Sequence, residues 1–318
     1  MSELSQSRTA TAAPRRSSGL FGIDLASPKH ANKLGYLLLA PAALLILAIL
    51  VYPMLLAIDI SFHDVKFATL SFGSADYTLV NYQKLFSSPD FWNALRVTAQ
   101  LLLVVTSISM VVGMGTALLV NQQFRGRSFA RMLIALPWAI PEVVAVVTWV
   151  WILDASFGVL NWLLIKIGLI GGPVSWFSSP STAFSAVTMV MVWKGYPFIS
   201  IMILAGLQSI PEEYYQAAKV DGANVFQRFF WVTIPCIAPV LGVTLILTVL
   251  WVFRDFSIIY VLTGGGPVGA TETLAIMTYE EAFNFFRMGY ASSIGVVTLV
   301  ICAVISAFLV KKTSHAIY

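Results

Sequence analysis

Four ionisable residues stand inside long apolar stretches of this 318-residue sequence: Glu142, Lys194, Arg254 and Asp255. A charged side chain is costly in such surroundings, and by default it marks either a pathway for a polar ligand or an internal ion pair. Two of these residues are acids and two are bases, so every charge has a potential partner. The sequence therefore leaves both interpretations open.

The spacing before Asp255 favours a binding role. Thr248, Trp251, Val252 and Asp255 follow one another at intervals that place them on one face of a helix. That face offers a hydroxyl group, an aromatic plane and a carboxylate. Sugars are bound by this chemistry, since their C–H faces stack on aromatic rings and their hydroxyls take charge-assisted hydrogen bonds.

A second polar and aromatic pair lies in an earlier apolar stretch. Lys194 and Phe198 are one helical turn apart, and Gly195 permits close approach of a ligand or a helix. Prolines in these stretches free backbone groups, which membrane helices tolerate beside a cavity or a neighbouring helix. They are Pro137, Pro141 and Pro197.

The elements that position these residues follow from composition. The sequence is 58% hydrophobic and 11% charged, whereas a soluble domain carries about 25% charged residues. Its apolar runs reach the roughly 20 residues that a membrane helix needs, and they lack the alternation of a β-barrel. The predicted spans are Gly35–Ile60, Ala94–Val120, Met132–Leu153, Ala183–Leu207, Ile237–Leu262 and Met288–Val310. We therefore predict an all-α, polytopic membrane protein with six transmembrane helices.

Lysine and arginine fall mainly on one side of these spans, which predicts that both termini are cytoplasmic. The basic residues of that side are Arg8, Arg15, Arg16, Lys29, Lys33, Arg125, Arg127, Arg131, Lys219, Arg228, Lys311 and Lys312. The opposite side carries Lys66, Lys84, Lys166 and Arg287. The net charge of +4 is thus a topology signal, and no basic motif indicates nucleic-acid binding. Residues 1–34 are predicted to be a disordered cytoplasmic tail rather than a transit peptide, and residues 35–318 form the membrane domain.

A long polar segment, residues 208–236, connects two spans on the predicted cytoplasmic side. Its "IPEEYYQAAK" has a proline and two acids at a helix start, and Gly222 can take a positive φ at low cost. Asp221 is expected to cap a second short helix, Asn224–Trp231. Two short helices joined at a glycine would form a projecting knob, and a connector lying on lipid headgroups is the alternative.

The stretch "EEYYQAAKVDGANVFQRFFWVTIP" resembles the EAA loop of ABC-importer permeases. Gln216 stands where that family most often has glutamate. The resemblance implies a coupling helix that docks on a cytoplasmic ATPase subunit. The residues that it assigns to coupling are Glu213, Gln216, Ala217, Ala218, Asp221, Gly222 and Pro235.

Further motifs resemble the carbohydrate-uptake branch of these permeases, among them "VNYQKLFSSPDFWNAL", "WKGYPF" and "LTGGGPVGATETL". The likeness runs from about Tyr36 to the last span and implies a type I ABC importer permease fold in a bacterial inner membrane. The chain would be the membrane-spanning subunit of an ATP-driven sugar importer. Its implied partners are a second homologous permease, two ABC ATPase subunits and an extracytoplasmic sugar-binding protein.

No GxxxxGK[ST] motif occurs in the chain, so we predict that it is not an enzyme and holds no cofactor. ATP and Mg²⁺ would be bound by the partner ATPase. An importer of a non-sugar solute and an ion-coupled secondary transporter are the alternatives, although the latter would usually show two repeated halves.

In maltose-type permeases the sugar is held from two spans, and alignment on "GYPF" and "LTGGGP" carries that role to this chain. The implied substrate residues are Lys194, Gly195, Phe198, Thr248, Trp251, Val252 and Asp255, and the intramembrane charges add Glu142 and Arg254. The glycine-dense loop is expected to be a flexible surface that docks the binding protein, through Gly264, Gly265, Gly266 and Pro267. Whether the sugar is neutral or anionic stays open.

Overall fold

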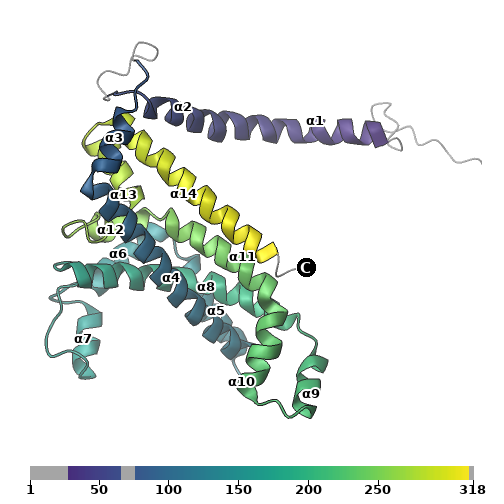
Figure 1. Ribbon diagram of the computed structural model, residues 1–318. Coiled ribbons are helices and arrows are strands. Elements are labelled where there is room, and N and C mark those ends of the chain that lie inside the picture. Colours follow the sequence, from purple (N-terminus) through teal and green to yellow (C-terminus); the bar gives the residue numbers. More distant parts are fainter. Residues whose placement is uncertain (1–27, 66–75, 315–318) are drawn as a thin grey trace, which may run out of the picture. The chain divides into compact units, whose positions relative to one another are not determined.

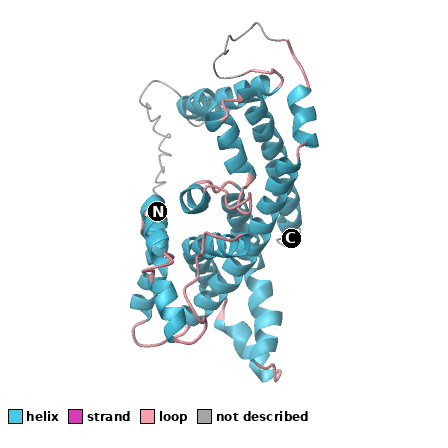
Figure 2. Ribbon diagram, turned by 90° about the vertical axis from the view of Figure 1, so that its left-hand side faces the viewer, coloured by secondary structure: helices cyan, strands magenta, loops and turns pink. Residues whose placement is uncertain are grey.

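The computed structural model describes residues 28–65 and 76–314, and every regular element among them is a helix (Figures 1 and 2). Internal contacts divide the chain into two units, Met1–Leu56 and Ala57–Tyr318. Residues 1–27 of the predicted tail lie outside the described residues, and the first helix already begins at Pro28.

The first unit is a single helical run. It consists of α1 (Pro28–Ile46), the π-helical turn η1 (Leu47–Val51) and α2 (Tyr52–Ser61), whose last residues belong to the second unit. The segment Tyr36–Ser61 is long and apolar enough to cross a membrane. This confirms the first predicted span, because continuous hydropathy alone specifies such a helix.

The second unit holds the remaining helices. They are α3 (Val80–Ser87), α4 (Pro89–Asn121), α5 (Arg127–Ala139), α6 (Glu142–Ile152), α7 (Val159–Lys166), α8 (Pro180–Gln208), α9 (Glu212–Val220), α10 (Val225–Arg228), η3 (Phe229–Thr233), α11 (Ile234–Phe253), α12 (Ser257–Thr263), α13 (Leu274–Tyr279), η4 (Glu280–Asn284) and α14 (Met288–Ser314). Within the described residues, α4, α8, Val225–Phe253 and α14 are continuous candidate spans, as predicted.

The third predicted span, Met132–Leu153, is broken rather than straight. Its two halves, α5 and α6, meet at an angle of 97°. Pro141 explains the break, because its ring disfavours helical backbone at the preceding residue and it has no N–H for the helix ladder. Ile140 is accordingly extended, with a ψ of 134°.

The fifth predicted span, Ile237–Leu262, is displaced and interrupted. The helix begins at Val225, because α10, η3 and α11 run on as one rod, and it ends at Phe253. Arg254, Asp255 and Phe256 then separate it from α12. The Oδ1 atom of Asp255 accepts a hydrogen bond from the N–H of Ile258 at 3.2 Å, so the break is capped by one of its own residues.

The core of the second unit lies between α4 and α8, which lie side by side with α6, α11, α12 and α13 around them (Figure 1). Gly113 of α4 faces Ile199 of α8, where a Cβ atom would lie only 2.5 Å from Cγ2 of Ile199. Small residues let membrane helices approach in this way. The close contact fixes α8, which carries two of the predicted site residues, against α4.

Candidate functional site

A cavity of about 380 Å³ lies among α4, α8, the α5–α6 break and the α11–α12 break. Its lining includes Ser109, Trp138, Glu142, Met191, Lys194, Gly195, Thr248, Trp251, Val252, Arg254 and Asp255. Both helix breaks lie at the cavity, where α5 ends at Ala139 and α11 ends at Phe253. The charged residues Glu142, Arg254 and Asp255 follow these ends and line the cavity. Every substrate residue predicted from the sequence lies here except Phe198.

Phe198 stands behind the lining and supports it. Its ring centroid is 4.5 Å from that of Trp251 and 6.3 Å from that of Trp138. Three aromatic rings from α5, α8 and α11 thus form a continuous surface at the cavity. Such a surface offers π-faces and apolar area to the C–H face of a ligand.

Trp138 was not predicted as a site residue. As part of a straight third span it carried no signal that would set it apart from tryptophans at the membrane interface. The break after Ala139 brings α5 to an end beside the cavity, and this places the indole there. Trp138 could therefore be recognised as a site residue only once the position of the break was known.

The four intramembrane charges do not pair with one another. Within the described residues the ion pairs are His63–Asp59, Lys84–Asp64 and Arg287–Glu281. Lys194 instead donates hydrogen bonds to the carbonyl oxygens of Pro137, at 2.9 Å, and Ile140, at 2.5 Å. Among the described residues no two of these four side chains form an ion pair, so this structure gives no support to structural ion pairs between them.

Two hydroxyl groups complete the polar part of the cavity. Thr248 donates to the carbonyl oxygen of Thr244 at 2.8 Å, which leaves its oxygen able to accept a hydrogen bond. Ser109 of α4 is buried and its Oγ has no hydrogen-bond partner among the described residues. Aromatic planes, hydroxyls and charged groups converge in this cavity.

The polar connector forms one separate helix, α9, at the end of the second unit opposite α3 and α13 (Figure 1). Gly222 has a φ of +79°, as the sequence predicted. Two details differ from the prediction. The cap of the next helix is Asn224, which forms a capping box with Gln227, rather than Asp221. That next helix also does not end at Trp231, because the helical backbone runs on without a break from Val225 to Phe253.

The predicted coupling residues gather on the surface of this connector. Those on α9 and its following turn are exposed or half-buried, and a hollow of about 420 Å³ is lined by Ala218, Asp221, Gly222 and Trp231 among others. Pro235 lies apart, in the first turn of α11. The hydroxyl groups of Tyr215 and Thr233 lie 3.0 Å apart and fasten α9 to the start of the fifth span. The sequence analysis did not single out this pair.

Comparison with known proteins shows the family to which the chain belongs. The profile of the family described as "binding-protein-dependent transport system inner membrane component" matches residues 109–311, more than half of the chain. The chain belongs to this family. The matched region contains both the cavity and the connector with α9.

Several relatives of this inner membrane component are permeases named for the solutes of their transport systems. The trehalose/maltose transport system permease protein MalF of Thermococcus litoralis is 38% identical over 85% of this chain and 90% of its own length. The sulfoquinovosyl glycerol transport system permease protein SmoG of Agrobacterium fabrum is 35% identical over 87% of this chain and 89% of its own.

A solved structure shares the fold. A chain of a bacterial ABC transporter involved in the import of the acidic polysaccharide alginate matches with a TM-score of 0.76, at 25% identity over 90% of this chain and 96% of that chain. The component thus has an ABC importer permease fold, as the resemblance implied. It is a transport subunit of an inner membrane and not an enzyme, and its partners are of the kind found in such importers.

The glycine-dense loop of this inner membrane component forms hydrogen bonds within itself and to α4. The N–H of Thr271 donates to the carbonyl oxygen of Gly265 at 3.1 Å, and the Thr271 hydroxyl donates to that of Gly266 at 2.9 Å. Asn93 of α4 donates to the carbonyl oxygen of Gly269 at 2.9 Å. The tip of the loop, Val268, is 95% exposed. The loop is therefore a projection that hydrogen bonds tie to α4 and to Thr271.

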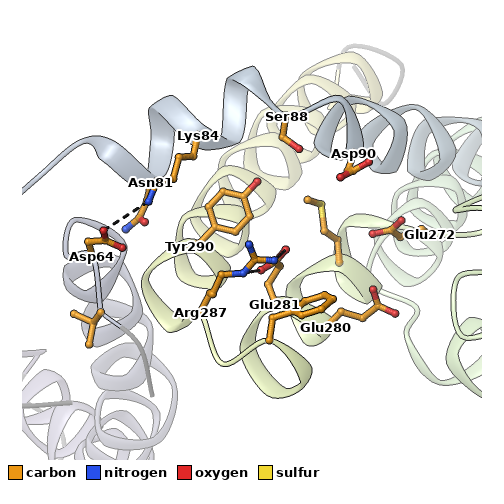
Figure 3. Close-up of a pocket in the computed structure, with 13 residues that line it drawn as sticks. Asp64, Asn81, Lys84, Ser88, Asp90, Glu272, Glu280, Glu281, Arg287 and Tyr290 are labelled. Carbon is orange, nitrogen blue, oxygen red and sulfur yellow. Dashed lines mark hydrogen bonds and ion pairs between the residues drawn. The ribbon is translucent and has the colours of Figure 1, made fainter. Parts of the chain in front are cut away.

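A second cavity, of about 740 Å³, lies near this loop between α3, the start of α4 and η4 (Figure 3). Arg287 binds Glu281 at 2.6 Å and Lys84 lies 3.6 Å from Asp64. Asp90, Glu272 and Glu280 line the same cavity without an ion pair among the described residues. The sequence analysis did not predict this acidic cavity, because its residues are scattered over five helical elements and the loops between them.

Burial and like charges act together on one carboxyl group of this cavity. Burial, followed by the charges of Glu280, Asp90 and Glu281, raises the pKa of Glu272 to about 7. Burial also raises the pKa of Glu281, and Arg287 acts in the opposite direction. Glu272 therefore titrates near neutral pH.

Proposed function

We propose that this chain is one permease subunit of an ATP-driven importer of carbohydrates. The observation that carries the proposal is the cavity within the spans, where Trp138 and Trp251 stand beside hydroxyl and charged groups. Aromatic stacking combined with charge-assisted hydrogen bonds is the chemistry of sugar recognition. The relatives named for trehalose and maltose and for a sulfoquinovosyl glycerol support a glycoside as the substrate class.

The cavity is one half of the translocation pathway. Its tryptophans are exposed on one side, Trp138 by 53% and Trp251 by 38%, and Glu142 and Arg254 are exposed there too. Charged groups inside a membrane protein face the interior of a helix bundle or a water-filled path rather than lipid. A second, homologous permease covers this side, and the substrate passes between the two subunits.

The energy for transport comes from two ABC ATPase subunits on the α9 side, which bind ATP and Mg²⁺. The exposed surface of α9 and the turn at Gly222 form their docking site. Closure of the ATPase dimer draws the two permeases into a state open to the binding protein, and hydrolysis returns them to the inward-open state. The binding protein delivers the sugar at the opposite end, beside the glycine-dense loop.

The test is uptake of a labelled disaccharide into vesicles that contain this chain with its partner permease and ATPase, at saturating binding protein. Trp251→Ala removes a stacking plane, and we expect a three- to tenfold lower rate, the range for loss of an aromatic contact. Trp162→Ala is the control, because Trp162 is also exposed, at 60%, but lies on α7 outside the cavity. Equal rates in both variants would refute the assignment of this cavity to the sugar.

A further inference from the structure

The Lys194 ammonium group is engaged by the protein itself. Its Nζ atom lies 2.9 Å from the carbonyl oxygen of Pro137, 3.4 Å from that of Trp138 and 2.5 Å from that of Ile140. Lysine carries three N–H donors and no acceptor. Three carbonyl oxygens at one break in one span therefore match the full donor capacity of this side chain.

These carbonyl groups have no helical partner because the span breaks there. In a continuing helix the carbonyl of Pro137 would accept from the N–H of residue 141, but Pro141 has none. The partners of the Trp138 and Ile140 carbonyls would be the N–H groups of residues 142 and 144, which the 97° turn carries away. Carbonyl groups left without a partner at membrane depth cost several kcal/mol each.

We propose that Lys194 is a positioning residue: its ammonium group takes the place of the missing helical hydrogen bonds and fastens the α5–α6 break to α8. This rests on the proposed function of the cavity, whose wall the break forms. Trp138 carries one of the three carbonyls and Glu142 lies two residues after the last of them, so the position of both side chains depends on Lys194. The contact with substrate is then made by the groups that Lys194 holds in place.

The three N–H donors of Lys194 are engaged by carbonyl groups, so its ammonium group offers no further donor to a substrate. The other cation of the cavity, Arg254, is exposed and forms no ion pair among the described residues.

The first experiment measures the break directly and requires no substrate. Val146 of α6 is 1% exposed, and a cysteine there in a Cys236→Ala, Cys302→Ala background reports whether α6 stays packed. In the assembled complex, Lys194→Met should raise the rate of N-ethylmaleimide labelling about tenfold or more, as expected from loss of a charged hydrogen-bond donor. Arg254→Met, which removes the other cation, should leave the labelling rate unchanged. Unchanged labelling in Lys194→Met, or equal increases in both variants, would overturn the proposal.

A second pair of variants tests the proposal if Lys194→Met assembles poorly. Pro141→Ala restores a backbone N–H that can pair with the Pro137 carbonyl. The loss of thermal stability caused by Lys194→Met should therefore be smaller in the Pro141→Ala background, and this coupling is measurable as a double-mutant cycle. Strict additivity would contradict the role of Lys194 at the break.

Uptake in the same vesicles separates this proposal from the proposed function. Lys194→Met should lower the maximal rate for a neutral disaccharide, and Lys194→Arg should restore part of it. Loss of uptake only for a sulfonated disaccharide in Lys194→Met would make Lys194 a substrate ligand and overturn the proposal. No sugar uptake by wild-type protein, together with faster labelling of Lys194→Met, would refute the sugar assignment and leave the positioning role intact.

Discussion

The contact between α4 and α8 allows a quantitative prediction for Gly113→Ala. A Cβ atom at this position would lie 2.5 Å from Cγ2 and 2.8 Å from Cβ of Ile199, which is 1% exposed. Carbon atoms prefer separations of about 3.5 to 4.0 Å. The two helices must therefore move apart by roughly 1 Å, and overpacking of this kind costs about 1–3 kcal/mol.

Gly115→Ala is a matched control on the same helix, because a Cβ atom there meets nothing within 4 Å. Both substitutions gain the same intrinsic helix propensity, about 0.8–1.0 kcal/mol. The difference between the two variants isolates the clash. We expect Gly113→Ala to be less stable than Gly115→Ala by about 1–3 kcal/mol.

The assay is unfolding of the purified chain in mixed micelles with increasing dodecyl sulfate, followed by far-ultraviolet circular dichroism. Uptake should change in parallel, because α8 also carries Lys194 and Phe198 to the cavity. Coincident midpoints for the two variants, or a more stable Gly113→Ala, would show that α4 and α8 do not pack as described.

Two further predictions concern the ends of the second unit. Gly222→Ala should lower the amount of sugar taken up per ATP hydrolysed, and Gly222→Asn should lower it less, because a φ of +79° is strained for alanine and accessible to asparagine. An added Cβ atom meets nothing within 4 Å, so steric contact does not contribute, and equal ratios in both variants would show that the turn does not require this φ. Glu272→Gln should raise the thermal midpoint at pH 8 and change it little at pH 5. The pKa of the Glu272 carboxyl is raised from 4.5 to about 7 in the folded protein, so folding becomes less favourable as the pH rises above 4.5, and glutamine removes this loss. A benefit of equal size at both pH values would contradict this shift.

The spans could be predicted from the sequence because hydropathy is a local property. Each continuous span depends on about 20 neighbouring residues, and α4, α8 and α14 lie where their apolar runs do. The α5–α6 break could have been predicted in part, because Pro137 and Pro141 leave backbone groups of the span without helical hydrogen bonds. Whether such groups kink a helix or end it depends on what satisfies them, and Lys194 lies more than fifty residues away in the sequence.

The candidate cavity shows the same division. The helical spacing of Thr248, Trp251 and Asp255 predicted a shared face, and all three line the cavity. The partners of the charged groups could not be predicted. The sequence shows only that the numbers of acids and bases are equal, whereas the hydrogen bonds of Lys194 depend on where the carbonyl groups lie in space. Glycine content likewise indicated a flexible loop, while the threonine and asparagine hydrogen bonds that hold it come from α4 and from the following turn.

The continuity of α10, η3 and α11 has a mechanical consequence. This rod of 29 residues is about 43 Å long at 1.5 Å per residue, and it joins the turn at Gly222 to the cavity residue Trp251. A tilt of about 10° around one end displaces the other by about 7 Å, close to the width of a sugar ring with its hydroxyls. In the proposed transport cycle this segment would act as a lever that carries a movement of the Gly222 turn to the cavity. Its π-helical turn, Phe229–Thr233, lies near the Gly222 end, where a bend would subtract most from that movement.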